Sequence, residues 1–384
     1  MTRGRFAPSP TGRMHLGNVF CALLSWLSAK SKGGEWVLRI EDLDPQRSKK
    51  DYALQLMDDL QWLDLPWDGE PVWQSQRGEI YEEYLQRLTD MGLTYPCYCT
   101  RADIMATQAP HETDGRVVYK GTCRPNTPSP STAQTVPLRQ GDERSGGGGL
   151  QPVHSSPLTV NCSPLTATTR LIVPDCTIPF TDGHYGKHDI NLAEHCGDYI
   201  IRRKDGAWAY QLAVVVDDAL MGVTEIVRGR DLLLSSPQQI HLRNLLFQST
   251  DDRVQMTDGL LKRKTITDAA RSVPTATSFT PQTVPLRQGD ERSGGGGLTA
   301  HRSPLTVDFF HHPLLCNAEG QRLCKRDKSM DLGYLRGTGI TPQEIIGKLA
   351  YLAGLTDTTT PITPSELLPL FSWKKVPTED IILK

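Results

Sequence analysis

The sequence predicts an α/β protein built on an open sheet, and three local patterns support this prediction. Arg3–Ala7 has the composition of a short strand and is followed by a turn rich in Pro and Gly. Asn18–Lys30 carries apolar residues at helical spacing. Glu35–Ile40 is an apolar run of strand length. A strand, a helix and a second strand in this order are typical of α/β proteins.

The turn between the first strand and the helix is a candidate anion site. Pro8 and Pro10 lack backbone donors and stop the strand, and Gly12 permits a tight turn. His15–Asn18 then begins the helix, whose free N–H groups and dipole favour a negative ligand. For His15–Asn18 taken alone, an ordinary turn with a hydrogen-bonded histidine is the simpler interpretation.

Acidic residues follow the second predicted strand. Glu41, Asp42 and Asp44 come directly after Glu35–Ile40. Residues at the carboxyl ends of strands bind ligands in open α/β sheets, so these carboxylates are candidate site residues. An exposed acidic loop is the alternative. Two amphipathic helices are predicted beyond this loop, at Lys50–Leu63 and Arg77–Met91.

Composition limits the class of protein. The 384 residues suffice for two or more domains, and 38% hydrophobic with 22% charged residues is ordinary for a soluble protein. No apolar run approaches the roughly 20 residues of a membrane span, and Arg3, Arg5 and the prolines interrupt any secretory signal. A net charge of −2 confines any RNA site to a local basic patch. We therefore expect a cytoplasmic protein.

Three of the nine cysteines form a candidate metal site. Cys97, Cys99 and Cys123 lie within 27 residues, in a chain without the secretory signal that would favour disulfides. Thiolates at this spacing fit tetrahedral zinc if a fourth ligand is present, and His111 can supply it on chemical grounds. Buried or free thiols are the alternative, because cysteine often packs as a small apolar residue.

Two segments rich in Thr, Ser, Pro and Gly interrupt the predicted elements. The same seventeen residues occur without change at Gln134–Leu150 and Gln282–Leu298. Each copy carries four consecutive glycines and no helix or strand pattern, so it cannot bury enough apolar surface to offset chain entropy. We expect 126–168 and 249–307 to be disordered insertions rather than units of a repeat fold.

Further elements are predicted after the first insertion. Apolar runs at Asp198–Arg203 and Ala207–Val216 flank the turn signal Lys204–Gly206. Ser236–Gln239 has the pattern of a capping box that begins a helix ending at Phe247. The remaining signals are strands at Arg170–Val173 and Val223–Val227, a turn at Thr181–His184, and capping boxes beginning at Thr341 and Thr363.

Several strings in these elements resemble class I aminoacyl-tRNA synthetases. RFAPSPTGRMHLGN at residues 5–18 is similar to the HIGH signature in the form used by the glutamyl branch, as is RIEDLD at 39–44. AYQLAVVVDD at 209–218 and GVTEIVRGRDLL at 222–233 resemble the second half of its Rossmann core. GQRLCKRD at 320–327 resembles the KMSKS motif, although Cys324 stands where Ser is usual.

The cysteine array resembles the zinc site of the glutamyl-queuosine tRNA(Asp) synthetase family, a truncated branch of the glutamyl-tRNA synthetases. YPCYCTRADI and YKGTCRP carry this resemblance. A tyrosine is the fourth ligand in that family, which implies zinc bound by Cys97, Cys99, Tyr119 and Cys123, with His111 as the fallback. The resemblance covers roughly 2–125, 169–247 and 309–384.

The resemblance implies a class I synthetase Rossmann-type catalytic domain with an inserted zinc-binding subdomain and a short C-terminal helical region. The chain ends soon after the last capping box, so we expect no anticodon-binding domain. The implied parts are a first catalytic half (1–96), the zinc-binding subdomain (97–125), an insertion (126–168), a second catalytic half (169–248), an insertion (249–307), and the KMSKS-like loop with the C-terminal helices (308–384).

The resemblance also implies the residues of the active site. Those that would bind glutamate are Arg5, Phe6, Ala7, Pro8, Ser9, Glu41, Tyr210 and Arg228. Those that would bind ATP, with Mg²⁺, are His15, Gly17, Asn18 and Lys325; His15 and Lys325 would also be catalytic. A guanidinium fork matches a carboxylate, and a tyrosine hydroxyl adds direction. A core tyrosine and a surface arginine are the alternatives for Tyr210 and Arg228.

The implied activity is the activation of glutamate with ATP and its transfer to queuosine in the anticodon loop of tRNA(Asp). The expected partners are this tRNA, glutamate and ATP, with no membrane, and we expect a monomer. Three alternatives stay open: an ordinary glutamyl-tRNA synthetase without its anticodon domain, a non-catalytic tRNA-binding paralogue, and a chain that cannot fold around the insertions. The presence of all the implied catalytic and substrate residues favours the enzyme.

Overall fold

The computed structural model describes residues 1–106, 118–125, 167–247, 306–323 and 331–383. The two predicted insertions fall almost wholly outside these ranges, and so do His111, Cys324 and Lys325. The expected disorder of the insertions and the expected part boundaries therefore stay predictions. Within the described ranges, no helix is long and apolar enough to cross a membrane.

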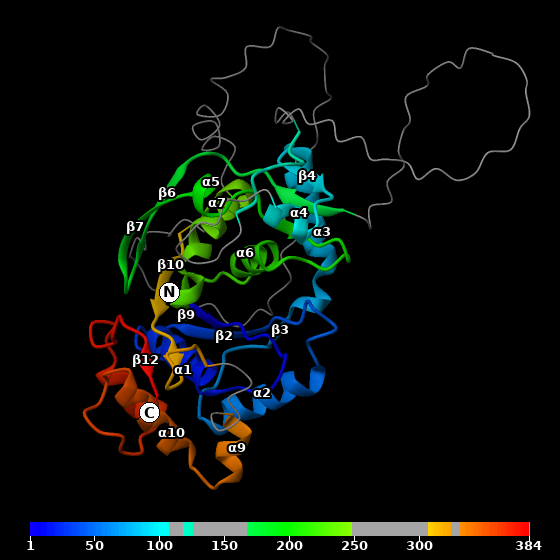
Figure 1. Cartoon of the computed structure of the whole chain (residues 1–384). Coiled ribbons are helices and arrows are strands. Elements are labelled where there is room, and N and C mark those ends of the chain that lie inside the picture. Colours follow the sequence, from blue (N-terminus) through cyan, green and yellow to red (C-terminus); the bar gives the residue numbers. More distant parts are fainter. Residues whose placement is uncertain (107–117, 126–166, 248–305, 324–330, 384) are drawn as a thin grey trace, which may run out of the picture.

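A seven-stranded sheet organises the fold, with its strands in the order β3-β2-β1-β9-β10-β6-β7 (Figure 1). Every neighbouring pair is parallel except β6 and β7, which form an antiparallel hairpin at the edge. The predicted open α/β fold is thus confirmed. The strands are β1 (Arg3–Phe6), β2 (Glu35–Ile40), β3 (Val72–Trp73), β6 (Thr177–Asp182), β7 (Gly186–Asn191), β9 (Glu225–Gly229) and β10 (Asp308–His312).

The strand order reverses beside β1. Gly4 pairs with Trp36 of β2 on one side and with Glu225 of β9 on the other. The chain first builds outward from β1 to β3, and it later returns to the opposite side of β1 with β9 and β10. Ligands of open α/β sheets bind at such a reversal, outside the carboxyl ends of the strands.

Helix α1 (Leu16–Lys30) begins at a side-chain cap. The Nδ1 of His15 accepts the N–H of Gly17 at 3.1 Å, and the Oδ1 of Asn18 accepts the N–H of His15 at 3.2 Å. This reciprocal pair satisfies two donors of the first turn. The helix packs on β1 and β9, and Gly4 permits the close approach because a Cβ there would lie 3.0 Å from that of Ala29.

The other helices complete both layers of the fold. Figure 1 shows α1 and α2 on one side of the central strands and α6 on the other. Their bounds are α2 (Lys50–Trp62), α3 (Gly78–Asp90), α4 (Arg101–Ala106), α5 (Leu192–His195), α6 (Tyr210–Leu220), α7 (Ser236–Phe247), α9 (Leu332–Gly337), α10 (Pro342–Leu352) and α11 (Pro364–Leu367), with 3₁₀ turns η1 (Gln74–Gln76), η3 (Arg230–Ser235) and η5 (Leu368–Leu370).

Two smaller sheets lie beside this core. An antiparallel sheet consists of β4 (Thr94–Cys97), β5 (Thr168–Leu171) and β8 (Ile200–Arg202). A parallel pair joins β11 (Leu315–Cys316) to β12 (Ile381–Ile382). The second pair places the last described residues next to the segment that precedes the KMSKS-like string.

Most locally predicted elements are confirmed. The strand Glu35–Ile40 has the predicted bounds, and the predicted helix after Ser236 ends at Phe247 as expected. The capping boxes at Thr341 and Thr363 are both formed, with Glu344 and Glu366 completing them. The apolar run Ala207–Val216, to which the pattern alone assigns no element type, is helical from Tyr210 and packs against α7.

A buried carboxylate ties α6 to the start of α3. Asp217 accepts hydrogen bonds from the Nε2 of Gln74 at 2.8 Å, the Nε of Arg77 at 2.6 Å and the hydroxyl of Tyr81 at 2.7 Å. Its side chain is fully buried. A buried carboxylate is tolerated only when donors and a cation satisfy it, and all three donors here depend on this one group.

We expect Asp217→Ala to lower the free energy of unfolding by about 3 kcal/mol, because it leaves Arg77 and two neutral donors without their buried partner. Urea unfolding followed by circular dichroism measures this change. The matched control is Glu83→Ala, which removes an exposed helix pair with Arg87 and should cost less than about 0.5 kcal/mol. Equal effects of the two substitutions would contradict the assigned role of Asp217.

Candidate functional site

A cavity of about 430 Å³ opens at the carboxyl ends of β1 and β9, where the strand order reverses. Eleven of the twelve residues that the resemblance assigns to glutamate or ATP line it, from five separate segments of the fold. These residues are Arg5, Phe6, Ala7, Pro8, Ser9, His15, Gly17, Asn18, Glu41, Tyr210 and Arg228. The twelfth, Lys325, lies outside the described residues.

The helix cap fixes the ring of His15 at one end of the cavity. Nδ1 accepts the N–H of Gly17, so a neutral ring carries its proton on Nε2. The residue is 8% exposed and lines the cavity next to the first turn of α1. A donor and a helix N-terminus at one place fit an anionic group such as a phosphate.

Two buried arginines beside the cavity are paired with carboxylates. The Nη1 of Arg39 lies 2.6 Å from Asp218, and its Nη2 lies 3.1 Å from Glu41. The Nε of Arg5 lies 3.5 Å from Asp218. Burial would by itself raise the pKa of Asp218, but the guanidinium groups of Arg39 and Arg5 outweigh burial and lower that pKa. Asp218 is thus a fixed negative charge.

The pKa of Glu41 shifts in the opposite direction from that of Asp218. Burial raises the pKa of its carboxyl group, and Arg39 and Arg5 offset this only in part. Because Glu41 lines the cavity, an ammonium group placed there would favour its ionised form. The group is therefore suited to a cationic part of a ligand.

Arg228 is buried and contacts no carboxylate of the described residues. The other described arginines that line the cavity, Arg5, Arg13 and Arg322, each contact an aspartate. The pKa of Arg228 is lowered, mainly by burial; Arg5 adds to the effect, and Tyr210 and the charge of Asp218, which does not contact Arg228, oppose it. A buried cation without a counter-ion favours an anionic ligand.

The predicted capping box at Ser236–Gln239 is wrong. Ser236 is itself helical, with φ −61° and ψ −48°, because η3 leads directly into α7. Its hydroxyl accepts from the Nη2 of Arg228 at 2.8 Å, and the Oε1 of Gln239 accepts from Nη1 at 2.7 Å. Sequence reasoning missed this function of the two side chains. Their position just after the GVTEIVRGRDLL string was the available signal.

A buried aspartate links the N-terminal turn to the C-terminal helices. The Oδ1 of Asp59 in α2 lies 3.2 Å from Arg13 of the turn and 2.7 Å from Arg336 of α9. The backbone N–H of Leu332 also donates to the carbonyl of Met14 at 2.9 Å. Sequence reasoning missed this connection, because the residues come from three distant segments.

A second cavity of about 540 Å³ adjoins the first. Ser9, Thr11, Glu41 and Tyr210 line both, so the two spaces share a wall. Its remaining lining includes polar and aromatic groups, among them Asp44, Arg47, Arg203 and Trp208. A ligand in this second space would lie next to one held in the first.

Arg203, which lines this second cavity, and its chain neighbour Arg202 are already paired. Arg202 contacts Glu82 and stacks 4.4 Å from the ring centroid of Trp208, while Arg203 contacts Asp44 and Asp205. Exposed pairs of this kind are weak and can be exchanged for another anion.

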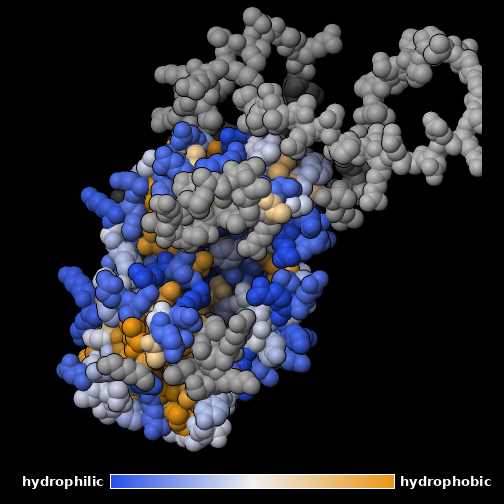
Figure 2. Space-filling view, in the orientation of Figure 1, coloured by the Kyte–Doolittle hydropathy of each residue, from blue (hydrophilic) through white to orange (hydrophobic). Residues whose placement is uncertain are grey.

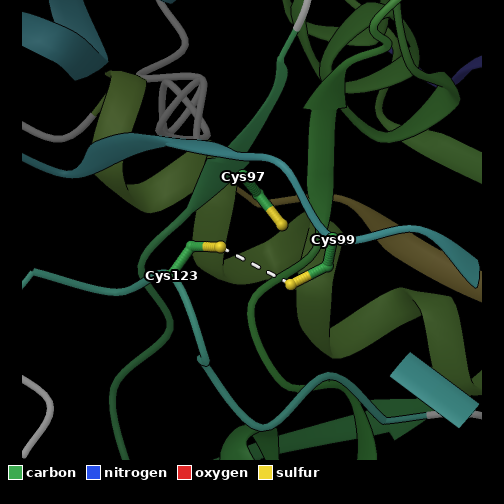
Figure 3. A group of neighbouring side chains, drawn as sticks. All are labelled: Cys97, Cys99 and Cys123. Atoms are coloured by element: carbon green, nitrogen blue, oxygen red, sulfur yellow. Dashed lines mark hydrogen bonds between the residues drawn. The ribbon is translucent and has the colours of Figure 1, made fainter. Parts of the chain in front are cut away.

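The predicted cysteine cluster is assembled in the fold (Figure 3). The sulfurs of Cys97, Cys99 and Cys123 all lie within 4.8 Å of one another, and the Cys99 and Cys123 sulfurs are 3.5 Å apart. A tetrahedral zinc ion with Zn–S bonds of about 2.3 Å would place its sulfurs roughly 3.8 Å apart. The cluster therefore has the size that such an ion requires.

Tyr119 lies at the remaining corner of the cluster. Its hydroxyl is 3.4 Å from the Cys97 sulfur and 3.6 Å from the Cys99 sulfur, and it accepts the N–H of Cys123 at 2.8 Å. Burial opposes ionisation of the Cys123 thiol, but the hydrogen bond from Tyr119 outweighs it, and the pKa falls to about 7. The geometry accommodates Tyr119 as a fourth ligand, and His111 lies outside the described residues.

The surface separates polar and apolar regions. Figure 2 shows hydrophilic side chains over most of this face and apolar ones gathered over the C-terminal elements. Tyr334, Tyr351, Leu370 and Ile382 of those elements are exposed. The two cavities, by contrast, carry charged side chains among their lining, such as Arg5, Glu41 and Arg228 in the first and Asp44 and Arg203 in the second.

Comparison with known proteins identifies the family. Residues 1–133 and 161–262 match the catalytic domain of tRNA synthetases class I (E and Q). The chain is 37% identical to the Glutamyl-Q tRNA(Asp) synthetase of Symbiobacterium thermophilum, over 99% of this chain and 95% of that protein. It is 34% identical to the protein of the same name from Nitratidesulfovibrio vulgaris, over 100% of this chain and 95% of that protein.

Solved structures agree in fold. A glutamate tRNA ligase from Elizabethkingia meningosepticum superposes with a TM-score of 0.64 at 22% identity, over 100% of this chain and 67% of that chain. At this identity the likeness supports the architecture alone, with its reversal of strand order beside β1. The sequence matches carry the assignment further: the chain belongs to the glutamyl-Q tRNA(Asp) synthetase family of class I tRNA synthetases and is a ligase of the aminoacyl-tRNA synthetase type.

Proposed function

We propose that the protein activates glutamate with ATP and transfers the glutamyl group to queuosine in the anticodon loop of tRNA(Asp). The observation that carries the proposal is the cavity at the carboxyl ends of β1 and β9, which gathers eleven implied substrate residues, among them Arg228, a buried arginine that contacts no carboxylate of the described residues. The names of the relatives from Symbiobacterium thermophilum and Nitratidesulfovibrio vulgaris support the choice of acceptor.

Glutamate fits the charge pattern of this cavity. Arg228 would bind one carboxylate through its guanidinium edge, with Tyr210 beside it. Glu41 would accept the ammonium group, and Arg5 and Ser9 would complete the pocket. The second carboxylate then faces the first turn of α1, where the nucleotide would lie.

ATP, as its magnesium complex, would place its phosphates over the Pro8–Asn18 turn. A carboxylate oxygen of glutamate attacks the α-phosphorus, the bond from this phosphorus to the bridging oxygen breaks, and pyrophosphate leaves. Positioning and charge stabilisation supply most of the rate in such transfers. We assign these tasks to His15 and to Lys325, which lies outside the described residues.

The second cavity is the proposed place of the acceptor nucleoside. Its shared wall with the first would bring a ring hydroxyl to the carbonyl carbon of the adenylate, and AMP would leave as the ester forms. Unstacked bases of an anticodon loop are readily bound by aromatic and Arg groups, and Trp208 and Arg203 supply both.

We expect purified protein to exchange pyrophosphate into ATP with glutamate and without tRNA. The reason is that the proposed glutamate site and the described part of the proposed ATP site share one cavity that is already open without RNA. The measurement is glutamate-dependent incorporation of labelled pyrophosphate into ATP, with aspartate as the control amino acid. Strict dependence on glutamate tRNA would favour an ordinary glutamyl-tRNA synthetase, and no exchange under any condition would favour a binding-only paralogue.

We expect labelled glutamate to be transferred to tRNA(Asp) that contains queuosine and not to the same tRNA without it. The second cavity admits a nucleoside next to the adenylate, whereas a 3′ end would need a separate grip on the tRNA. Labelling is measured after acid precipitation, using both tRNAs at equal concentration. Enzymatic removal of the terminal adenosine is the control: if it ends the labelling, the 3′ end is the acceptor and the proposal fails.

We propose that zinc is bound by Cys97, Cys99, Tyr119 and Cys123, where it would hold β4 to the segment around Cys123. We expect one zinc ion per chain by elemental analysis, and a loss of affinity of about tenfold or more in Tyr119→Phe. Tyr98→Phe, an exposed tyrosine between two of the cysteines, is the control. Full affinity in Tyr119→Phe with loss in His111→Ala would move the fourth ligand to His111.

A further inference from the structure

Arg228 uses every N–H donor of its guanidinium group. An arginine has five such donors. Nε donates to the Nε2 of His311 at 3.0 Å, Nη1 to Gln239 at 2.7 Å and Tyr210 at 3.4 Å, and Nη2 to Ser236 at 2.8 Å and to the carbonyl of Leu232 at 3.2 Å. All five acceptors are neutral, so the contacts fix the group without cancelling its charge.

The five contacts fall into two sets. The three shortest go to His311, Gln239 and Ser236, none of which lines the cavity. The two longest go to Tyr210 and Leu232, which both line it. One long contact is on Nη1 and the other on Nη2. A carboxylate entering from the cavity can therefore replace these two and leave the three rear contacts intact.

Asp182 sets the protonation of the rear acceptor His311. The Oδ2 of Asp182 lies 2.7 Å from the Nδ1 of His311, and both side chains are fully buried. Asp182 is held in turn by the backbone N–H groups of His184 and Tyr185, at 2.9 and 2.8 Å. Nδ1–H therefore donates to the carboxylate, and Nε2 presents a lone pair to Arg228.

The same arrangement keeps His311 neutral. A proton on Nε2 would face the Nε–H of Arg228, so the hydrogen bond exists only in the neutral ring. Burial lowers the pKa of His311 to about 4; the hydrogen bond that His311 donates to Asp182 opposes this shift, and the charge of Arg228 adds to it. Asp182 thus fixes the imidazole of His311, and the imidazole in turn fixes Arg228. The negative charge of Asp182 does not come into contact with Arg228.

We propose that His311, Gln239 and Ser236 form a neutral cage behind Arg228, that Asp182 fixes His311 from outside this cage, and that these positioning residues make the site select a side chain ending in a carboxylate over one ending in an amide. This inference rests on the proposed function, and it names the residues that make the proposed enzyme prefer glutamate to glutamine. With the rear donors anchored, the two remaining donors face the cavity at a fixed angle. A carboxylate accepts both, whereas an amide presents its own donor to one of them and brings no charge.

The sharpest test changes the charge of the cage and preserves its shape. Gln239→Glu keeps an acceptor at Nη1 but puts a carboxylate on Arg228. We expect the KM for glutamate in pyrophosphate exchange to rise about tenfold or more, while the KM for ATP changes less than about twofold. The preference for glutamate over glutamine should fall by a similar factor. Gln55→Glu, an exposed position on α2, is the matched control for the added charge.

A second pair of variants tests the anchor. His311→Gln retains an acceptor for the Nε of Arg228, whereas His311→Leu removes it. We expect His311→Gln to keep a lower KM for glutamate than His311→Leu, with equal KM values for ATP in both. Thermal melting of each variant distinguishes this effect from a loss of folding. A variant with a damaged fold would show both a higher KM for ATP and a lower melting temperature.

The outcomes separate this inference from the proposed function. If the unaltered protein shows no glutamate-dependent exchange, the proposed function fails. If the unaltered protein exchanges but Gln239→Glu leaves both the glutamate KM and the discrimination against glutamine unchanged, the neutral cage is rejected and the proposed function stands. A parallel rise in the glutamate and ATP constants of Gln239→Glu would also reject it, since a general distortion would then explain the change.

Discussion

The parallel pairing of β1 with β9 is the constraint on which the rest of the site depends. It joins Gly4 to Glu225 across more than half of the chain, and the N–H of Arg3 donates to the hydroxyl of Thr224 at 2.9 Å beside it. This pairing creates the reversal of strand order. It also brings the end of β1, the start of α1 and Arg228 to one edge, where the backbone itself leaves room for a ligand.

Among the described residues, the charged groups at this edge of the sheet are of two kinds: some are compensated within the protein, and one is not. Arg39 and Asp218 compensate one another within the protein, so they stabilise the fold and offer little to a ligand. Arg228 carries a buried charge that only neutral atoms contact. Such a group costs stability until an anion binds, which is the usual compromise at a site that must recognise charge.

Polar links also tie the site to parts of the fold that do not touch a substrate. Asp59 joins the N-terminal turn to α9, and β12 pairs with β11 shortly before the KMSKS-like string. The first link attaches α9 to α2 and to the N-terminal turn, and the second attaches the last described residues to the segment after β10. Asp59 of α2 therefore holds α9 in position, and β12 holds the segment that precedes the KMSKS-like string.

The sequence by itself determined the α/β class, the bounds of β2, the end of α7, the caps at Thr341 and Thr363, and the residues of the cavity and the cysteine cluster. Periodicity, caps and motif strings are local, so they are readable without a structure. The tertiary structure alone decided the use of Ser236 and Gln239, which a local pattern assigns to a helix cap. Their partner Arg228 competes for the same hydroxyl and amide, and its anchor His311 lies 83 residues further along the chain. Contacts between residues so far apart in the sequence depend on which strands become neighbours in the sheet. A pattern within one segment of the sequence cannot predict that.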